Sequence, residues 1–193
     1  MLRHLCFIGD SFVQGCGDPA LLGWVGRLCA PLAAPGRDLT VYNLGIRGQT
    51  SSQIRRRWRA EAEPRLPAGS PAGLVFSFGA NDSAQAVPPA ETLAHTAIIL
   101  AEAMSIAPTL MLGPPPIADD PAAEERLARL CPALAEVARR LSVPYLPVHA
   151  ALRHDPAWRD EALANDGAHP AAAGYAALAR LAASWPAWRA WFA

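Results

Sequence analysis

The chain has 193 residues, of which 52% are hydrophobic and 18% are charged, as expected for one globular domain spanning residues 1–193. Its 17 basic residues, all of them arginine, balance 17 acidic residues, so bulk charge gives no reason to expect a nucleic acid or an anionic membrane as partner. The lack of lysine excludes Schiff-base chemistry and a lysine-bearing phosphate loop. The composition therefore favours a small-molecule partner.

Short apolar runs alternate with segments of helical length along the whole chain. The expected strands are 2–8, 39–44, 74–78, 109–112 and 143–148, and the main expected helices are 21–32, 51–63, 90–106, 124–141 and 171–183. Pro132 should kink or divide the helix over 124–141. Five alternations of strand and helix predict an α/β protein with a five-stranded parallel sheet and helices on both faces.

The ends of the chain and its cysteines suggest a reduced environment. The first strand begins almost at Met1 and leaves no room for a secretory signal, so we expect a cytoplasmic protein. Cys6, Cys16, Cys29 and Cys131 show no zinc-ligand spacing and should be free, buried thiols. The aromatic segment 185–192 is expected to form a short helix that covers the core rather than a partner surface.

Two segments far apart in the sequence carry the residue types of a serine hydrolase. An apolar run ends at Gly9-Asp10-Ser11, which should leave Ser11 exposed at the carboxyl edge of the sheet, where open α/β sheets bind ligands. Asp166 and His169 are three positions apart and can share one turn, so that the carboxylate orients an imidazole able to accept the serine proton.

The second and third strands end in segments that can supply hydrogen-bond donors at the same edge. Acyl transfer places negative charge on a carbonyl oxygen, and that charge needs fixed donors about 3 Å away. Gly45 has no Cβ and lets its backbone N–H approach closely, and Asn81 offers a side-chain amide that stays neutral. Asp82 is interpreted as a turn residue.

These residues resemble the four blocks of the SGNH hydrolase, or GDSL-type esterase/lipase, superfamily. The blocks are Gly9-Asp10-Ser11, Gly45, Gly79-x-Asn81-Asp82 and Asp166-x-x-His169, in the same order and over nearly the whole chain. The resemblance implies a three-layer α/β/α, flavodoxin-like fold. It also implies Ser11 as nucleophile, His169 as general base, Asp166 as its orienting partner, and an oxyanion hole from the Ser11 and Gly45 N–H groups with the Asn81 amide. Phe12 stands where leucine is commoner.

Each of these residues also has a purely structural interpretation. Ser11 could cap a following helix, and His169 could start one before Pro170. His149 and His154 are five apart and do not match helical zinc spacing, so no metal site is expected. The arginine run 55–59 should be a solvated helix face paired with Glu61 and Glu63, while Arg47 could touch a substrate.

The sequence therefore predicts an ester hydrolase that forms an acyl-enzyme on a small or short-chain acyl ester, with no metal and no organic cofactor. An acyltransferase or a thioesterase would use the same triad. A nucleotide- or flavin-binding module is the alternative from another class, because residues 9–17 could cradle a phosphate. Substrate specificity would come mainly from the loops 82–89 and 113–122.

Overall fold

A five-stranded parallel sheet forms the centre of the computed structural model, which describes residues 2–193. Its strands lie in the order β2-β1-β3-β4-β5, and every neighbouring pair is parallel. This confirms the predicted sheet. The strands are β1 (His4–Gly9), β2 (Thr40–Gly45), β3 (Ala72–Ser77), β4 (Thr109–Leu112) and β5 (Tyr145–Leu146).

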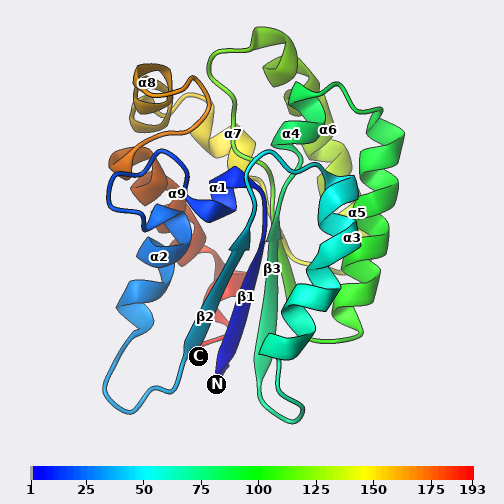
Figure 1. The fold of residues 1–193 in the computed structure, drawn as a ribbon, viewed down its shortest axis with the longest axis vertical. Helices are drawn as coiled ribbons and strands as arrows, with labels where there is room; N and C mark the ends of the chain where they lie inside the picture. Colours follow the sequence, from blue (N-terminus) through cyan, green and yellow to red (C-terminus); the bar gives the residue numbers. More distant parts are fainter. Residues whose placement is uncertain (1) are drawn as a thin grey trace.

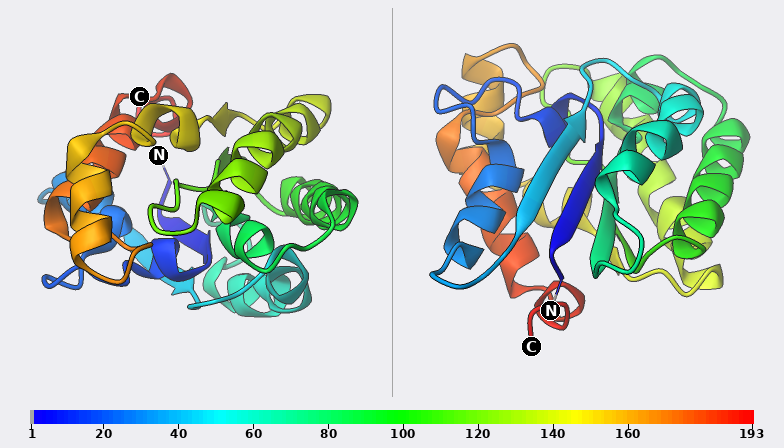
Figure 2. Two further views of the ribbon diagram at one scale, coloured as in Figure 1. Left: turned by 90° about the horizontal axis from the view of Figure 1, so that it is seen from above. Right: turned by 60° about the horizontal axis from the view of Figure 1, so that its bottom comes forward.

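Helices pack on both faces of the sheet, as Figure 1 shows. One side is covered by α2 and α9, and the other by α3 and α5; Figure 2 shows both layers from above and from below. The helices are α1 (Ser11–Gln14), α2 (Gly23–Cys29), α3 (Ser51–Ala62), α4 (Ala80–Ala84), α5 (Pro89–Met104), α6 (Pro121–Arg140), α7 (Val148–Leu152), α8 (Pro156–Ala164), α9 (Ala172–Ser184) and α10 (Pro186–Arg189), with short 3₁₀ turns at Ala30–Leu32 and Glu63–Arg65.

The alternation of side chains along β1 explains the three layers. Leu5 and Phe7 enter the core shared with α2 and α9, whereas Cys6 and Ile8 enter the core shared with α3 and α5. All four side chains are fully buried, so β1 contributes apolar surface to both faces. The sequence of a strand that is covered on both faces is a continuous apolar run, and residues 5–8 form such a run.

Helix α6 is longer than expected and is not divided. It continues from Pro121 to Arg140 through Pro132, so the prediction that Pro132 divides it is wrong. Pro132 lies on the exposed side of the helix, where water can reach the carbonyl that loses its hydrogen bond. Leu127, Leu130 and Leu134 bury the opposite side and hold the two halves together.

The structure also places the four cysteines, the C-terminal segment and two further helices. All four cysteines are free, with Cys6 and Cys29 buried and Cys16 and Cys131 half-buried. The C-terminal segment forms α10, which buries Trp188 against Phe7. Helices α7 and α8 were not predicted. None of the helices in residues 2–193 is both long and apolar enough to span a membrane.

The arginine run on α3 is only partly a solvated face. The predicted ion pairs form between Arg57 and Glu61 at 2.8 Å and between Arg59 and Glu63 at 2.7 Å. However, the Arg57 side chain is only 13% exposed, and it donates to Gly9 O at 2.8 Å and to Leu44 O at 2.9 Å. Arg57 therefore ties together the carboxyl ends of β1 and β2, instead of facing solvent as predicted.

Candidate active site

The carboxyl end of β1 fixes the backbone around Ser11. A Cβ at Gly9 would clash with Ser77 O on the neighbouring strand, so only glycine fits there. Asp10 then caps α1 by accepting a hydrogen bond from Phe12 N at 3.0 Å. The helix cap is thus Asp10, and the interpretation of Ser11 as the cap is wrong. Ser11 is the first helical residue, and its N–H finds no acceptor within residues 2–193.

Ser11, His169 and Asp166 form a connected chain of hydrogen bonds. Ser11 Oγ lies 2.7 Å from His169 Nε2, and His169 Nδ1 lies 2.8 Å from Asp166 Oδ2. With its proton on Nδ1, His169 donates to the carboxylate and accepts from the serine hydroxyl. Ser11 is only 3% exposed, because the imidazole covers it, so the expectation of an exposed serine is wrong.

The turn that carries Asp166 and His169 is rigidly hydrogen-bonded. Asp166 Oδ1 accepts the backbone N–H of His169 at 2.8 Å and that of Ala168 at 3.2 Å. Burial opposes ionisation of Asp166, but these bonds and the His169 ring lower the pKa of its carboxyl to about 2. Gly167 O accepts the N–H groups of Ala118 and Asp119, which joins this turn to the loop after β4. Asp166 therefore stays anionic and fixes the imidazole.

Arg47 also binds this carboxylate, a contact that sequence reasoning did not find. Arg47 Nη2 donates to Asp166 Oδ2 at 2.9 Å, and the arginine side chain is 65% exposed. The two residues are 119 positions apart, and an exposed arginine in a loop gives no periodic signal. The one hint was the closeness of Arg47 to Gly45 at the end of β2.

The last residue of β2, Gly45, and a glycine of the following loop, Gly48, are the candidate backbone donors. Gly45 packs so closely against α1 that a Cβ there would clash with Gln14 N, as expected for a close approach. Its N–H donates to Asn43 Oδ1 at 3.0 Å and is already occupied. Gly48 adopts φ +79°, and its N–H has no acceptor within residues 2–193.

Asn81 is held next to the same loop. Its Nδ2 donates to Gln49 O at 3.1 Å, which leaves the second amide hydrogen for another acceptor. Gly79 precedes α4 at φ +121°, a conformation that glycine adopts without strain. The backbone and the Asn81 amide therefore bring hydrogen-bond donors to the edge of the sheet that also carries Ser11.

Two buried carboxylates lie beneath this edge. Asp82 is in the first turn of α4 and accepts hydrogen bonds from Ser51 N at 2.9 Å and Thr92 Oγ1 at 3.0 Å. It thus links α3, α4 and α5, and the interpretation as a turn residue is wrong. Asp10 Oδ2 has no partner among the described residues, and burial, reinforced by the charge of Asp82, raises the pKa of Asp10 to about 7.

The remaining histidine candidates do not form a metal site. His149 Nε2 lies 2.7 Å from Glu124 Oε1, and Glu124 Oε2 accepts the N–H of Ile117, so this pair anchors the loop after β4 to α6 and α7. His154 is exposed. Over residues 2–193 the structure contains no group of three or more His, Cys, Asp or Glu side chains arranged to hold a metal ion.

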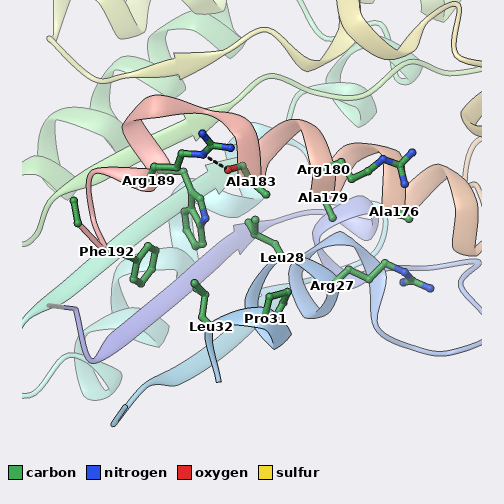
Figure 3. A pocket seen from close by; sticks show the side chains of 12 residues that line it. Arg27, Leu28, Pro31, Leu32, Ala176, Ala179, Arg180, Ala183, Arg189 and Phe192 are labelled. Atoms are coloured by element: carbon green, nitrogen blue, oxygen red, sulfur yellow. Dashed lines mark hydrogen bonds between the residues drawn. The ribbon is translucent and has the colours of Figure 1, made fainter. Parts of the chain in front are cut away.

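One groove of the molecule lies away from Ser11. A groove of about 570 Å³ runs between α2 and α9 and continues to α10, as Figure 3 shows. Leu28, Leu32 and Phe192 form its apolar wall, and Arg27 and Arg180 lie at one end. The groove is not lined by Ser11, Asp166 or His169 and is therefore separate from these residues.

Comparison with protein families identifies the group to which the chain is related. Residues 7–177 match the model of the GDSL-like lipase/acylhydrolase family. The chain belongs to this family. Its matched region includes Ser11, Asn81, Asp166 and His169, the residues that the structure brings to one edge of the sheet. No curated protein shows a significant sequence match.

Solved structures with the same fold include esterases and acylhydrolases. The lipase/acylhydrolase from Enterococcus faecalis is 26% identical, with a TM-score of 0.78, and 93% of each chain is covered. TesA is also 26% identical, with a TM-score of 0.76 and coverage of 97% of this chain and 98% of that chain. An acetylxylan esterase from Geobacillus stearothermophilus, at 19% identity, shares the fold with a TM-score of 0.75, covering 92% and 90%.

The family match, together with the fold, makes the chain an SGNH-type serine hydrolase. The family match decides against the alternative of a nucleotide- or flavin-binding module. The predicted resemblance and the α/β fold class are both confirmed by these comparisons.

Proposed function

We propose that this GDSL-like hydrolase cleaves small acyl esters through an acyl-enzyme on Ser11. The observation that carries the proposal is the continuous chain from Ser11 Oγ to His169 Nε2 at 2.7 Å and from His169 Nδ1 to Asp166 Oδ2 at 2.8 Å. His169 would remove the proton of Ser11 as the oxygen attacks the ester carbonyl. The imidazolium would then protonate the leaving alkoxide, and neutral His169 would activate water for deacylation.

The oxyanion would be held by donors that are free at the same edge. Ser11 N–H has no acceptor within residues 2–193, and Asn81 keeps one amide hydrogen after donating to Gln49 O. We assign the third donor to the loop after β2. Gly45 can take this role only when its bond to Asn43 breaks, whereas Gly48 has an N–H without an acceptor in the described chain and directly precedes Gln49, beside Asn81.

Replacing single backbone amides by esters separates the two glycines. Glycolic acid at position 45 or 48 removes the N–H and leaves the backbone shape and the absence of a side chain unchanged. Loss of an oxyanion donor typically lowers kcat by roughly 10²–10³, so we expect that loss for position 48 and a small effect for position 45. A large loss of kcat for position 45 alone would show that Gly45 supplies the oxyanion donor.

Covalent labelling is the direct test of the nucleophile. A fluorophosphonate should label the wild-type protein at Ser11, and Ser11→Ala should abolish both the labelling and the ester turnover. Ser77→Ala is the matched control, because Ser77 ends the neighbouring strand, paired with Gly9, and should keep full labelling. Labelling that persists at another serine in Ser11→Ala would refute the assignment.

The loops around the site favour short acyl groups. The loop after β4 is tied down through Trp158 Nε1 to Pro116 O at 3.2 Å and through Ile117 N to Glu124 Oε2 at 3.0 Å. Only residues 85–88 separate α4 from α5. Neither loop resembles a long lid that opens at a lipid surface. A series of p-nitrophenyl esters from acetate to palmitate should therefore show the highest kcat/KM at the short end. Activation by micelles together with a preference for long chains would contradict this.

A further inference from the structure

Arg47 reaches across the site from the loop after β2 to the turn that holds Asp166 and His169. Its Nη2 donates to Asp166 Oδ2 at 2.9 Å, and His169 Nδ1 lies 2.8 Å from that same oxygen. Two donors therefore share one carboxylate oxygen. One of them is permanently charged, because a guanidinium does not lose its proton in proteins.

Stability does not explain this contact. The Arg47 side chain is 65% exposed and that of Asp166 is 35% exposed, and ion pairs with this much solvent contribute little to folding. Asp166 also already has partners, since its other oxygen accepts two backbone N–H groups. The consequence of the contact must therefore be sought in the imidazole on the far side of the carboxylate.

The charges around this imidazole are otherwise negative or neutral. Within residues 2–193, Arg47 is the only arginine with an ion pair to Asp166. The titratable groups of the other elements that pack around the turn are all acids: Asp10 before α1, Cys16 after α1, Asp119 against Gly167, and Tyr175 on α9, which donates to Cys16 O. Removal of Arg47 would thus take away the one arginine that pairs with Asp166 within residues 2–193.

We propose that Arg47 is a positioning residue that lowers the pH at which His169 becomes able to accept the serine proton; this inference rests on the proposed function. Because both groups bind Asp166 Oδ2, the guanidinium and the imidazole are less than about 6 Å apart. A like charge at this separation disfavours the protonated imidazole. Arg47 also occupies part of the carboxylate that would otherwise stabilise that protonated form.

The test is the acid limb of kcat/KM for a small ester, measured from about pH 4.5 to 9. Arg47→Ala and Arg47→Gln should move the midpoint of this limb upward by about 0.5–1 pH unit, because both remove the charge. Arg47→Lys keeps a cation and should stay near the wild type. Arg56→Ala is the matched control, since Arg56 is an exposed arginine on α3 that pairs with no carboxylate of residues 2–193, and its midpoint should not move.

Salt provides a second measurement that does not require a mutation. At about 1 M salt the Debye length is about 3 Å, which is shorter than the separation between guanidinium and imidazole. The wild-type midpoint should then move upward toward that of Arg47→Ala. The midpoint of Arg47→Ala should not move upward, because the repulsion between guanidinium and imidazolium is already gone and salt can then only weaken the attraction of Asp166.

Several outcomes would decide against the inference. A uniform fall of kcat/KM at every pH with an unmoved midpoint would show that Arg47 only holds its loop. Because burial raises the pKa of Asp10 to about 7, inside the measured pH range, the comparison is repeated with Asp10→Asn, and loss of the Arg47 effect there would also overturn the inference. Failure of the proposed function is distinguishable from both, since Ser11 would then show neither fluorophosphonate labelling nor turnover in the wild-type protein.

Discussion

Replacing Asp10 by asparagine should change how the stability of the protein depends on pH. Asp10 is 1% exposed, its Oδ1 accepts Phe12 N at 3.0 Å, and its Oδ2 has no partner within residues 2–193. Burial raises the pKa of its carboxyl from 3.8 to about 7, which corresponds to about 4 kcal/mol. Asparagine has the same shape and keeps the acceptor for Phe12 N, but it cannot ionise.

The direction in which stability changes with pH follows from the protons that the folded and the unfolded protein bind. Between pH 4 and 7 the folded protein keeps the Asp10 proton while the unfolded chain has released it, so the free energy of unfolding falls as the pH rises. Above pH 7 both states are ionised and the penalty of about 4 kcal/mol is constant. As the pH rises from 4 to 9, the free energy of unfolding of Asp10→Asn should therefore increase by up to about 4 kcal/mol relative to that of the wild type.

Urea denaturation of both proteins at pH 4, 6, 7.5 and 9 measures this difference. Any constant effect of the new amide appears equally at every pH, and the titration of all other groups cancels between the two proteins, so only the change with pH is diagnostic. A difference in unfolding free energy that stays constant from pH 4 to 9 would show that the Asp10 carboxyl is not desolvated as the structure indicates.

Three further measurements test the site and the loop beside it. The kcat/KM for a small ester should rise with pH as His169 loses its proton, and a flat profile from pH 5 to 8 with chemistry rate-limiting would exclude His169 as base. Asn81→Ala should lower kcat by roughly 10² with the fold intact by circular dichroism, and a change in KM alone would make Asn81 a binding residue. The Asp18 carboxyl is buried, and its pairing with Arg27 lowers its pKa to about 2. Asp18→Asn should therefore lower the free energy of unfolding by about 2 kcal/mol at pH 7. Urea titrations should show this loss shrinking as the pH falls from 5 to 2.

The sheet and the convergence of the site could be predicted because they rest on short-range patterns. Apolar runs marked all five strands, and parallel strands bring their carboxyl ends to one edge of the sheet. Ser11 and Asn81 follow β1 and β3, which are neighbours in the sheet, so their convergence needed no knowledge of side-chain contacts. The pairing of Asp166 with His169 was equally local, since both side chains belong to one turn.

The features that were missed depend on contacts between distant segments. Arg57 was expected in solvent because its neighbours on α3 are charged, yet the backbone of β1 and β2 offers it two carbonyl oxygens. Asp82 looked like a turn residue because aspartate favours turns, and only the approach of Ser51 and Thr92 makes it a buried acceptor. In both residues the tertiary environment overrides a local preference that is correct on average.

Gly45, at the end of β2, and Gly48, in the following loop, show why a motif cannot by itself assign a backbone donor. The absence of a Cβ at Gly45 has a structural cause, the packing against Gln14 N, and its N–H is bound to Asn43. At Gly48 a Cβ would meet nothing within 4 Å, so packing does not require glycine; the positive φ does. That backbone conformation leaves the N–H without an acceptor in residues 2–193, next to the loop carbonyl that orients Asn81. We therefore propose Gly48 as the oxyanion ligand, because this glycine is kept for its conformation and its N–H is not used by the fold.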